Sequence, residues 1–317
     1  MREALFVKQN TEKWKYFEGT QQAKPDEIAN QFIEITNDLA YAKTFYPKSK
    51  TTAYLNGLAS KLHQSVYKNK KEKSNRFLYF WKTELPLIFF EYRKQIFYAL
   101  AFFLISCAIG ALSAKYDDTF VRLIMGDGYV NMTNENIAKG DPFGVYKQQN
   151  EFLMFLQIGA NNIYVALYTF VLGIIFSFGS IVSLFRNGIM LGSFQYFFFS
   201  RGLGLQSVLV IWIHGTLEIS AIVLAGAAGL VLGNSFLFPK TYTRMESTLK
   251  GAKQGLKIVL GLIPIFIVAA FFESFVTRHT EMPMAISLSI LLSSAVFIIW
   301  YVFIYPAKIN KKLAQIN

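Results

Sequence analysis

Five long apolar stretches constrain this chain more than any other feature of its sequence, because each is long enough to cross a bilayer as a helix. They cover residues 96–113, 161–184, 207–233, 256–276 and 285–305. Hydrophobic residues make up 53% of the 317 residues and charged residues only 16%, a balance outside the range of soluble globular proteins. The sequence therefore predicts an all-α fold, a polytopic membrane helix bundle.

A sixth apolar segment, residues 186–202, is shorter and either spans the membrane or re-enters it from one side. Charge favours a span, because Lys and Arg concentrate in cytoplasmic loops. With six spans, 26 of the 32 Lys and Arg residues fall on one side. With five, the basic loop 234–257 and the C-terminal tail move to the opposite side. We therefore predict six spans with both termini in the cytoplasm.

The formal net charge of +12 follows from the same distribution. It is a topology signal combined with attraction to anionic membrane lipids. Membrane lipids are therefore expected partners, and nucleic acid is not.

The predicted domain organisation has three parts. They are a cytoplasmic helical region (1–95) with an interfacial helix (76–94), the bundle (96–306) with its outer loop (114–160), and a cytoplasmic tail (307–317). Apolar residues in the first part recur at three- and four-residue steps, as in amphipathic helices. These are Ile28, Phe32, Ile35, Leu39 and Ala42, then Leu55, Leu58, Leu62 and Val66. Segment 76–94 combines aromatic with basic residues and is expected to bend near Pro86.

Polar residues inside apolar spans are candidate functional residues, because they are costly at membrane depth. The predicted outward-facing polar cluster consists of Asn161, Asn162, Gln195, His214, Glu218 and Glu273. Arg186 and Asn187 are expected to form a polar turn on the inner side. The clustering favours a partly wet cavity open to the outside.

Small residues at four-residue spacing predict close helix packing. The predicted packing positions are Gly188, Gly192, Gly215, Ala221, Ala225, Gly229 and Gly233. His214 and Glu218 continue this stripe, so they are expected to face neighbouring helices rather than lipid. The same stripes leave room for a homodimer.

Three interpretations of the His214–Glu218 pair remain open. The first, which we favour, is a hydrogen-bonded clamp between helices. The second is a proton- or substrate-responsive site, because histidine changes charge near neutral pH. The third is a metal site, although no second ligand pair is evident. We therefore expect no metal and no cofactor. No H-E-x-x-H, phosphate-binding loop or Ser-His spacing supports catalysis, so we predict that the protein is not an enzyme.

Two segments resemble the stage II sporulation protein M family of bacterial membrane proteins. They are "HGTLEISAIVLAGAAGLVLG" and the preceding "NNIYVALYTFVLGIIFSFGSIVSLFRNGIMLG". The N-terminal "REALFVKQNTEKWKYFE" resembles the start of the longer, non-sporulation members. The resemblance implies a multispan protein of the bacterial inner membrane, and its namesake works in a complex that remodels peptidoglycan. Positions carried over are Asn161, Asn162, Asn187, Gly188, His214, Gly215 and Glu218.

The expected function is a non-enzymatic scaffold that acts with other envelope proteins. The alternative is a transporter or lipid translocator with an outward-facing polar cavity around His214 and Glu218. Short, glycine-interrupted segments such as 186–202 often mark transporter sites, but no inverted repeat supports this alternative.

Overall fold

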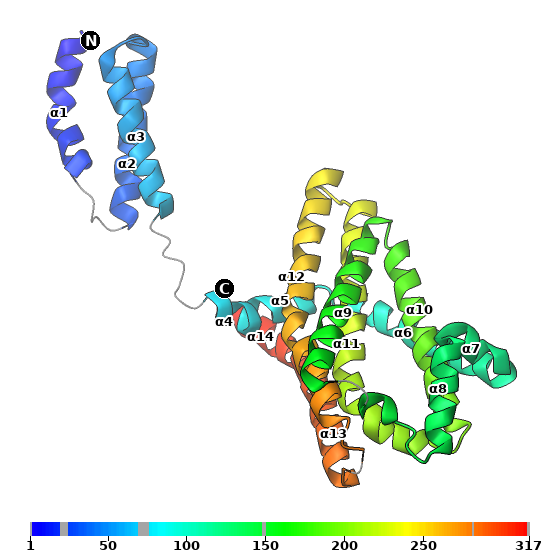
Figure 1. Cartoon of the computed structure of the whole chain (residues 1–317). Coiled ribbons are helices and arrows are strands. Elements are labelled where there is room, and N and C mark those ends of the chain that lie inside the picture. Colours follow the sequence, from blue (N-terminus) through cyan, green and yellow to red (C-terminus); the bar gives the residue numbers. More distant parts are fainter. Residues whose placement is uncertain (1, 20–24, 69–75, 148–149, 281, 316–317) are drawn as a thin grey trace. The chain divides into compact units, whose positions relative to one another are not determined.

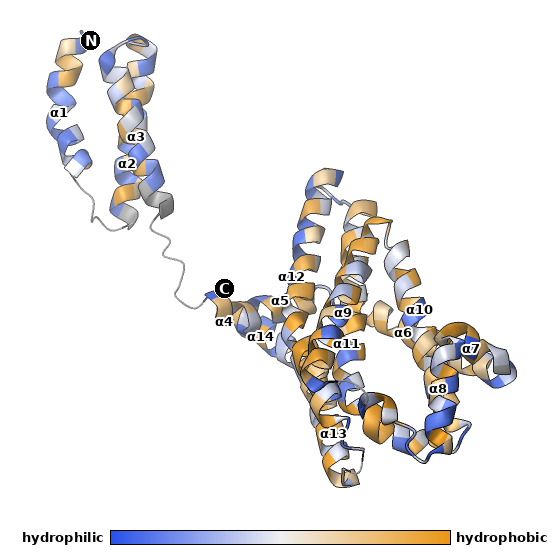
Figure 2. Ribbon diagram, viewed as in Figure 1, coloured by the Kyte–Doolittle hydropathy of each residue, from blue (hydrophilic) through white to orange (hydrophobic). Residues whose placement is uncertain are grey.

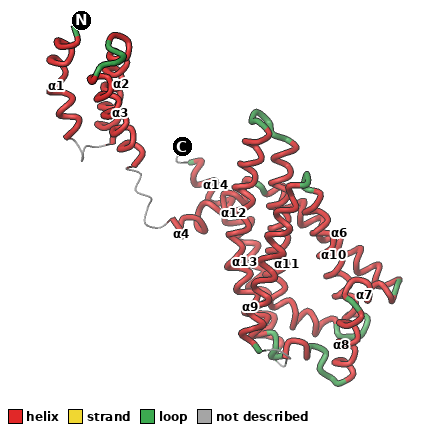
Figure 3. The backbone as a smooth tube through the Cα atoms, turned by 45° about the horizontal axis from the view of Figure 1, so that its top comes forward, coloured by secondary structure: helices red, strands yellow, loops and turns green. Residues whose placement is uncertain are grey.

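The computed structural model describes residues 2–19, 25–68, 76–147, 150–280 and 282–315, and every regular element in them is a helix (Figure 3). The chain divides into two compact units, residues 1–77 and 78–317, whose helices are labelled in Figure 1. The predicted all-helical fold is confirmed.

The first unit is a three-helix domain with its own apolar core. Its helices are α1 (Glu3–Gly19), α2 (Pro25–Phe45) and α3 (Lys50–Lys68). The predicted apolar faces of α2 and α3 meet, and their buried residues are Ile28, Ile35, Leu39, Ala42, Leu55, Leu58 and Leu62. The side chain of Val66 lies outside the described residues. Helix α1 adds Phe6, Trp14 and Phe17, a contribution that the periodicity did not predict. The indole of Trp14 donates a 2.8 Å hydrogen bond to Asp38 of α2.

The expected interfacial helix 76–94 begins with three short pieces, of which the second and third pack against the bundle. They are α4 (Arg76–Tyr79), the π-helix η1 (Phe80–Glu84) and α5 (Leu85–Glu91). Leu85, Ile88 and Phe89 are buried in the core of the second unit, so most of this segment belongs to that unit. Glu84 pairs with Lys257 at 2.6 Å, which attaches the segment to the bundle. Pro86 occupies the first turn of α5, where its missing N–H costs nothing.

Five helical stretches are long and apolar enough to cross a membrane. They are Arg93–Tyr116, Glu151–Ile174, Gly204–Leu237, Arg244–Val276 and Met284–Ala314. By label they are α6 (Arg93–Tyr116), α9 (Glu151–Val171) with η3 (Leu172–Ile174), α11 (Gly204–Leu237), α12 (Arg244–Phe271) with the π-helix η4 (Phe272–Val276), and α13 (Met284–Ile299) with η5 (Trp300–Ile304) and α14 (Tyr305–Ala314). Figure 2 shows how apolar residues dominate these helices, whereas polar and apolar residues alternate along the first unit.

The sixth candidate lies in α10 (Phe178–Phe199), which starts before the predicted segment 186–202. The predicted span 161–184 is confirmed as a span but its bounds are wrong: the helix runs over Glu151–Ile174, and the chain turns at Phe176 and Ser177, both of which have positive φ. Hydropathy misses this turn since its residues are apolar. At 22 residues α10 is long enough to cross a bilayer, but it carries Arg186 and is less apolar than the other five. The count of six spans remains a prediction.

Helix α11 is the centre of the bundle and contacts α6, α9, α10, α12 and α13. Ala221 and Ala225 are fully buried in it. Gly229 touches the α9–α10 corner so closely that an added Cβ would collide with Ser180. On α10, a Cβ at Gly192 would collide with the carbonyl oxygen of Cys107 in α6. These glycine faces are covered within the chain.

The predicted packing role of Gly215 is wrong, because a Cβ there would meet nothing within 4 Å. Gly188 and Gly233 do lie against neighbouring backbone, at α6 and at the α9–α10 corner respectively. The repeat of small residues thus continues past the point where helices touch, and Gly215 borders a cavity instead.

The predicted outer loop 114–160 is largely helical. It contains α7 (Asp118–Met125), α8 (Asp127–Ala138) and the 3-10 turn η2 (Gly144–Lys147), and its last ten residues begin α9. The ring of Phe143 stacks on Phe198 of α10 at 5.4 Å, which fixes this segment against the ends of α10 and α11.

Candidate functional site

His214, Glu218 and Glu273 come together inside the bundle. His214 and Glu218 lie one turn apart on the same face of α11, and Glu273 comes from η4. One ligand atom from each lies within 4.8 Å of the others, and His214 Nε2 is 3.9 Å from Glu273 Oε1. His214 is only 4% exposed, so these groups face each other within the protein rather than lipid.

A π-helical turn brings Glu273 and Thr277 to α11. The N–H of Thr277 donates to the carbonyl of Phe272, five residues earlier, at 2.8 Å. The Thr277 hydroxyl then lies 3.0 Å from His214 Nδ1. Such π-turns within α-helices are often found at functional sites, because the extra residue changes which side chains face inward.

Two phenols from the α8–η2 region border the same place. The Tyr146 ring meets the His214 ring edge-on, with 6.0 Å between centroids, and Tyr129 lines the adjoining cavity. Burial raises the pKa of Tyr146 well above its ordinary value, and it raises the pKa of Tyr129 as well. Both phenols therefore stay neutral at physiological pH.

The two carboxyl groups separate two cavities. One, of about 370 Å³, lies between α7, α10 and α11 and is lined by His214, Glu218 and Glu273. The other, of about 330 Å³, lies beside α9 and is lined by Asn161, Asn162 and the same two glutamates. The two carboxyl groups thus border a cavity on each side.

Asn162 is a second polar group of this region. It is 5% exposed and lies beside Glu218, yet its buried Nδ2 makes no hydrogen bond. Asn161, the next residue, is exposed. Both lie within helix α9 rather than at the start of a span, because α9 begins ten residues earlier, at Glu151.

Gln195, predicted as a member of the polar cluster, bonds elsewhere. Its Nε2 donates to Ser207 at 2.7 Å, and its Oε1 accepts from the Trp212 indole at 3.0 Å. Gln195 therefore joins α10 to α11 and leaves the cluster to His214, Glu218 and Glu273. Thr277 and Tyr146 are the neighbours that sequence reasoning missed. The only sequence signal for Thr277 is its position four residues after Glu273.

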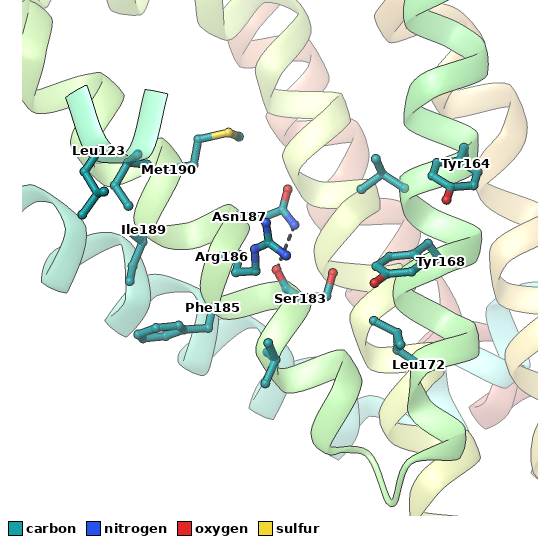
Figure 4. Close-up of a pocket in the computed structure, with 13 residues that line it drawn as sticks. Leu123, Tyr164, Tyr168, Leu172, Ser183, Phe185, Arg186, Asn187, Ile189 and Met190 are labelled. Carbon is teal, nitrogen blue, oxygen red and sulfur yellow. Dashed lines mark hydrogen bonds between the residues drawn. The ribbon is translucent and has the colours of Figure 1, made fainter. Parts of the chain in front are cut away.

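Arg186 and Asn187 do not form the predicted inner-side turn. They lie within α10, which is helical from Phe178 to Phe199. Asn187 Nδ2 donates to the carbonyl of Ser183 at 2.8 Å, the bond drawn in Figure 4. The turn itself is at Phe176 and Ser177, about three helical turns away.

Arg186 lies in a groove of about 730 Å³ between α9 and α10 (Figure 4). Tyr164 and Tyr168 line it from α9, and Leu123 of α7 closes one end. Arg186 is exposed, and among the described residues its guanidinium makes neither an ion pair nor a hydrogen bond.

The three cavities form a series. The groove shares Ile124 and Met190 with the 370 Å³ cavity, which in turn shares Glu218 and Glu273 with the 330 Å³ cavity. Ionisable side chains that lie in the apolar bundle therefore line adjacent cavities.

This fold and site define a class of protein, a polytopic helical membrane protein with a buried His–Glu–Glu cluster. A family model described as "Stage II sporulation protein M" matches residues 99–278, more than half of the chain, so the chain belongs to this family. Residues 4–68, which form most of the three-helix unit, match a model described as "Domain of unknown function (DUF8413)". Searches of the curated proteins and of the solved structures gave no match.

Proposed function

We propose that this protein binds amphiphiles with an anionic headgroup in the α9–α10 groove and moves them between the leaflets of the bacterial inner membrane. The supporting observation is the series of adjacent cavities, of which one is lined by Arg186 and the next by the His214 cluster. The proposal adopts the translocator alternative from the sequence, and it requires no covalent chemistry. Both termini would be cytoplasmic, as the charge distribution predicts.

Arg186 supplies the recognition of an anion. It lies eight residues after Phe178, roughly 12 Å along α10, and would be well inside the bilayer if α10 is the predicted sixth span. An unpaired guanidinium at that depth costs about 2.5 kcal/mol or more. A phosphate or carboxylate headgroup offsets that cost by forming paired hydrogen bonds with the guanidinium.

The walls of the groove suit the rest of an amphiphile. Leu172, Val182 and Phe185 present apolar surface for acyl chains. Tyr164 and Tyr168 add hydroxyl groups that donate to headgroup oxygens. Because Phe185 and Arg186 are both exposed on α10, a lipid enters the groove sideways from the bilayer.

The test is lipid exchange in proteoliposomes. Purified protein is reconstituted with fluorescent phosphatidylglycerol, and an impermeant reductant measures the rate at which label reaches the outer leaflet. We expect faster exchange than in empty liposomes, and about tenfold slower exchange with Arg186→Gln, which removes roughly 1.4 kcal/mol of pairing. Arg244→Gln is the matched control, because Arg244 is exposed at the start of α12. Exchange no faster than in empty liposomes would refute the proposal.

The scaffold hypothesis remains the second candidate, and the three-helix unit favours it. This unit has its own core and a separate family match, and it exposes Ile33 and Phe45 on α2. Defined envelope proteins that co-purify with the full chain, and are lost with Ile33→Glu and Phe45→Glu, would support a scaffold. If the same protein also fails to exchange lipid, the scaffold replaces the translocator.

A further inference from the structure

We propose that His214, Glu218 and Glu273 bind one divalent transition-metal ion, and that Zn²⁺ fits them best. The inference does not depend on lipid translocation. The sequence analysis left a metal site as the third interpretation of the His214–Glu218 pair and did not favour it, because no second ligand pair is evident. The structure supplies the third ligand, Glu273, from a different helix.

The positions of the three ligand atoms suit a metal ion. Zinc bonds to imidazole nitrogen and carboxylate oxygen are about 2.0–2.2 Å long, which places ligand atoms of a tetrahedral site roughly 3.3 Å apart. His214 Nε2 and Glu273 Oε1 are 3.9 Å apart, and all three ligand atoms lie within 4.8 Å of one another. Binding would require the glutamate side chains to rotate and bring their oxygens closer to Nε2.

Thr277 orients the histidine as metal sites require. A metal-binding imidazole nearly always donates its other N–H to a fixed acceptor, which selects the tautomer. Here Nδ1 lies 3.0 Å from the Thr277 hydroxyl, and Thr277 is 1% exposed. In the tautomer that a metal on Nε2 requires, Nδ1–H would donate to that hydroxyl oxygen. Nε2, which lies 3.9 Å from Glu273 Oε1, would then carry the free lone pair.

Charge also favours a cation. Two carboxyl groups lie among apolar helices, and no Lys or Arg of the described residues pairs with either of them. Uncompensated carboxylates in such a place are strongly unfavourable. A divalent ion neutralises both at once, and neutral His214 adds no further charge.

Asn162 is the independent observation that points to a ligand. It is nine-tenths buried and lines the cavity shared with both glutamates, and its Nδ2 has no hydrogen-bond acceptor. Three protein ligands leave the fourth position of a zinc ion open, and water normally takes it. Such a water, within the 330 Å³ cavity, would accept a hydrogen bond from Asn162.

The mixed donor set selects among metals. Ca²⁺ takes six to eight oxygen ligands and Mg²⁺ prefers an octahedral shell of oxygens, so an imidazole with two carboxylates suits neither. Imidazole suits Zn²⁺, Fe²⁺ and Ni²⁺, while carboxylate adds affinity for Mn²⁺. Zn²⁺ suits the low coordination number of three protein ligands and one water.

The test measures metal in the purified full-length protein in detergent. After chelation and dialysis against Zn²⁺, we expect about one equivalent by mass spectrometry, and less than a tenth of that with Glu218→Gln plus Glu273→Gln. Glu246→Gln, an exposed carboxyl at the start of the same helix as Glu273, is the matched control and should retain the metal. Wild-type protein that holds no Zn²⁺, Mn²⁺ or Fe²⁺ would overturn the proposal.

A second measurement uses the wild-type protein, so its result does not depend on whether the glutamate variants fold. Wild-type protein titrated with Co²⁺ should develop visible absorption bands typical of four- or five-coordinate cobalt, and the chelator EDTA should remove them. A hydrogen-bonded clamp without metal gives no such bands, and that result would refute the metal site. Lipid exchange by zinc-free protein is measured in parallel, so failure of the two proposals can be told apart.

Discussion

The two polar regions of the bundle differ in whether their ionisable side chains have partners within the protein. Around His214, an imidazole and two carboxyl groups lie within 4.8 Å of one another and are closed in by α11, η4 and the phenol of Tyr146. Around Arg186, a single guanidinium stands without a partner among the described residues in a groove of about 730 Å³. The first arrangement suits a small ion that stays bound. The second suits a ligand that carries its own charge and enters from the bilayer. Variants that affect one region and spare the other test this distinction.

The largest expected effect is the loss of metal binding with the double variant Glu218→Gln, Glu273→Gln. Losing one outer-shell contact costs 10–100-fold in affinity, so losing two direct ligands should weaken Zn²⁺ binding by more than about 100-fold. Lipid exchange should change less than about twofold if the regions are independent. Calorimetric titration and the liposome assay measure the two quantities. Parallel loss of both would mean that the cluster and the groove form one site.

Thr277→Val should have the next largest effect. Valine keeps the shape of threonine but cannot accept the hydrogen bond from His214 Nδ1. We expect zinc affinity to fall about 10-fold to 100-fold, as for other groups that orient a ligand. Thr277→Ser keeps the hydroxyl and should bind nearly as well as wild type. Equal affinity in the valine variant would show that the hydroxyl does not position the imidazole.

Met190→Trp should separate the two regions physically. Met190 lines both the groove and the 370 Å³ cavity, so a larger ring there fills space where the two adjoin. Lipid exchange should slow about threefold to tenfold, in line with one or two kcal/mol of overpacking, whereas zinc content stays at one equivalent. Val182→Trp, on the groove wall alone, is the control for bulk. Unchanged exchange with Met190→Trp would place the lipid path elsewhere.

The sequence predicted much of this arrangement, and its errors have physical causes. The four-residue spacing alone placed His214 and Glu218 on one face of a helix. Glu273 was a candidate because it is a polar residue inside an apolar span. The turn at Phe176 and Ser177 escaped detection because it is apolar, and this error moved Arg186 from mid-helix to a predicted loop. Thr277 reaches His214 through a π-turn, which no hydrophobic period encodes.

The smallest expected effects come from two glycines for which the sequence predicted the same packing role. Their substitution by alanine should change the stability of the bundle in different directions. Gly192→Ala should destabilise the bundle by about 1–3 kcal/mol, because the new Cβ collides with the carbonyl of Cys107 and two helices must separate. Gly215→Ala should be neutral or stabilise by up to about 1 kcal/mol, since its Cβ enters open cavity and alanine favours the helix. Thermal unfolding in detergent measures both. Equal destabilisation by the two substitutions would mean that α11 is packed tightly at Gly215 as well, and that the space beside the His214 cluster is closed.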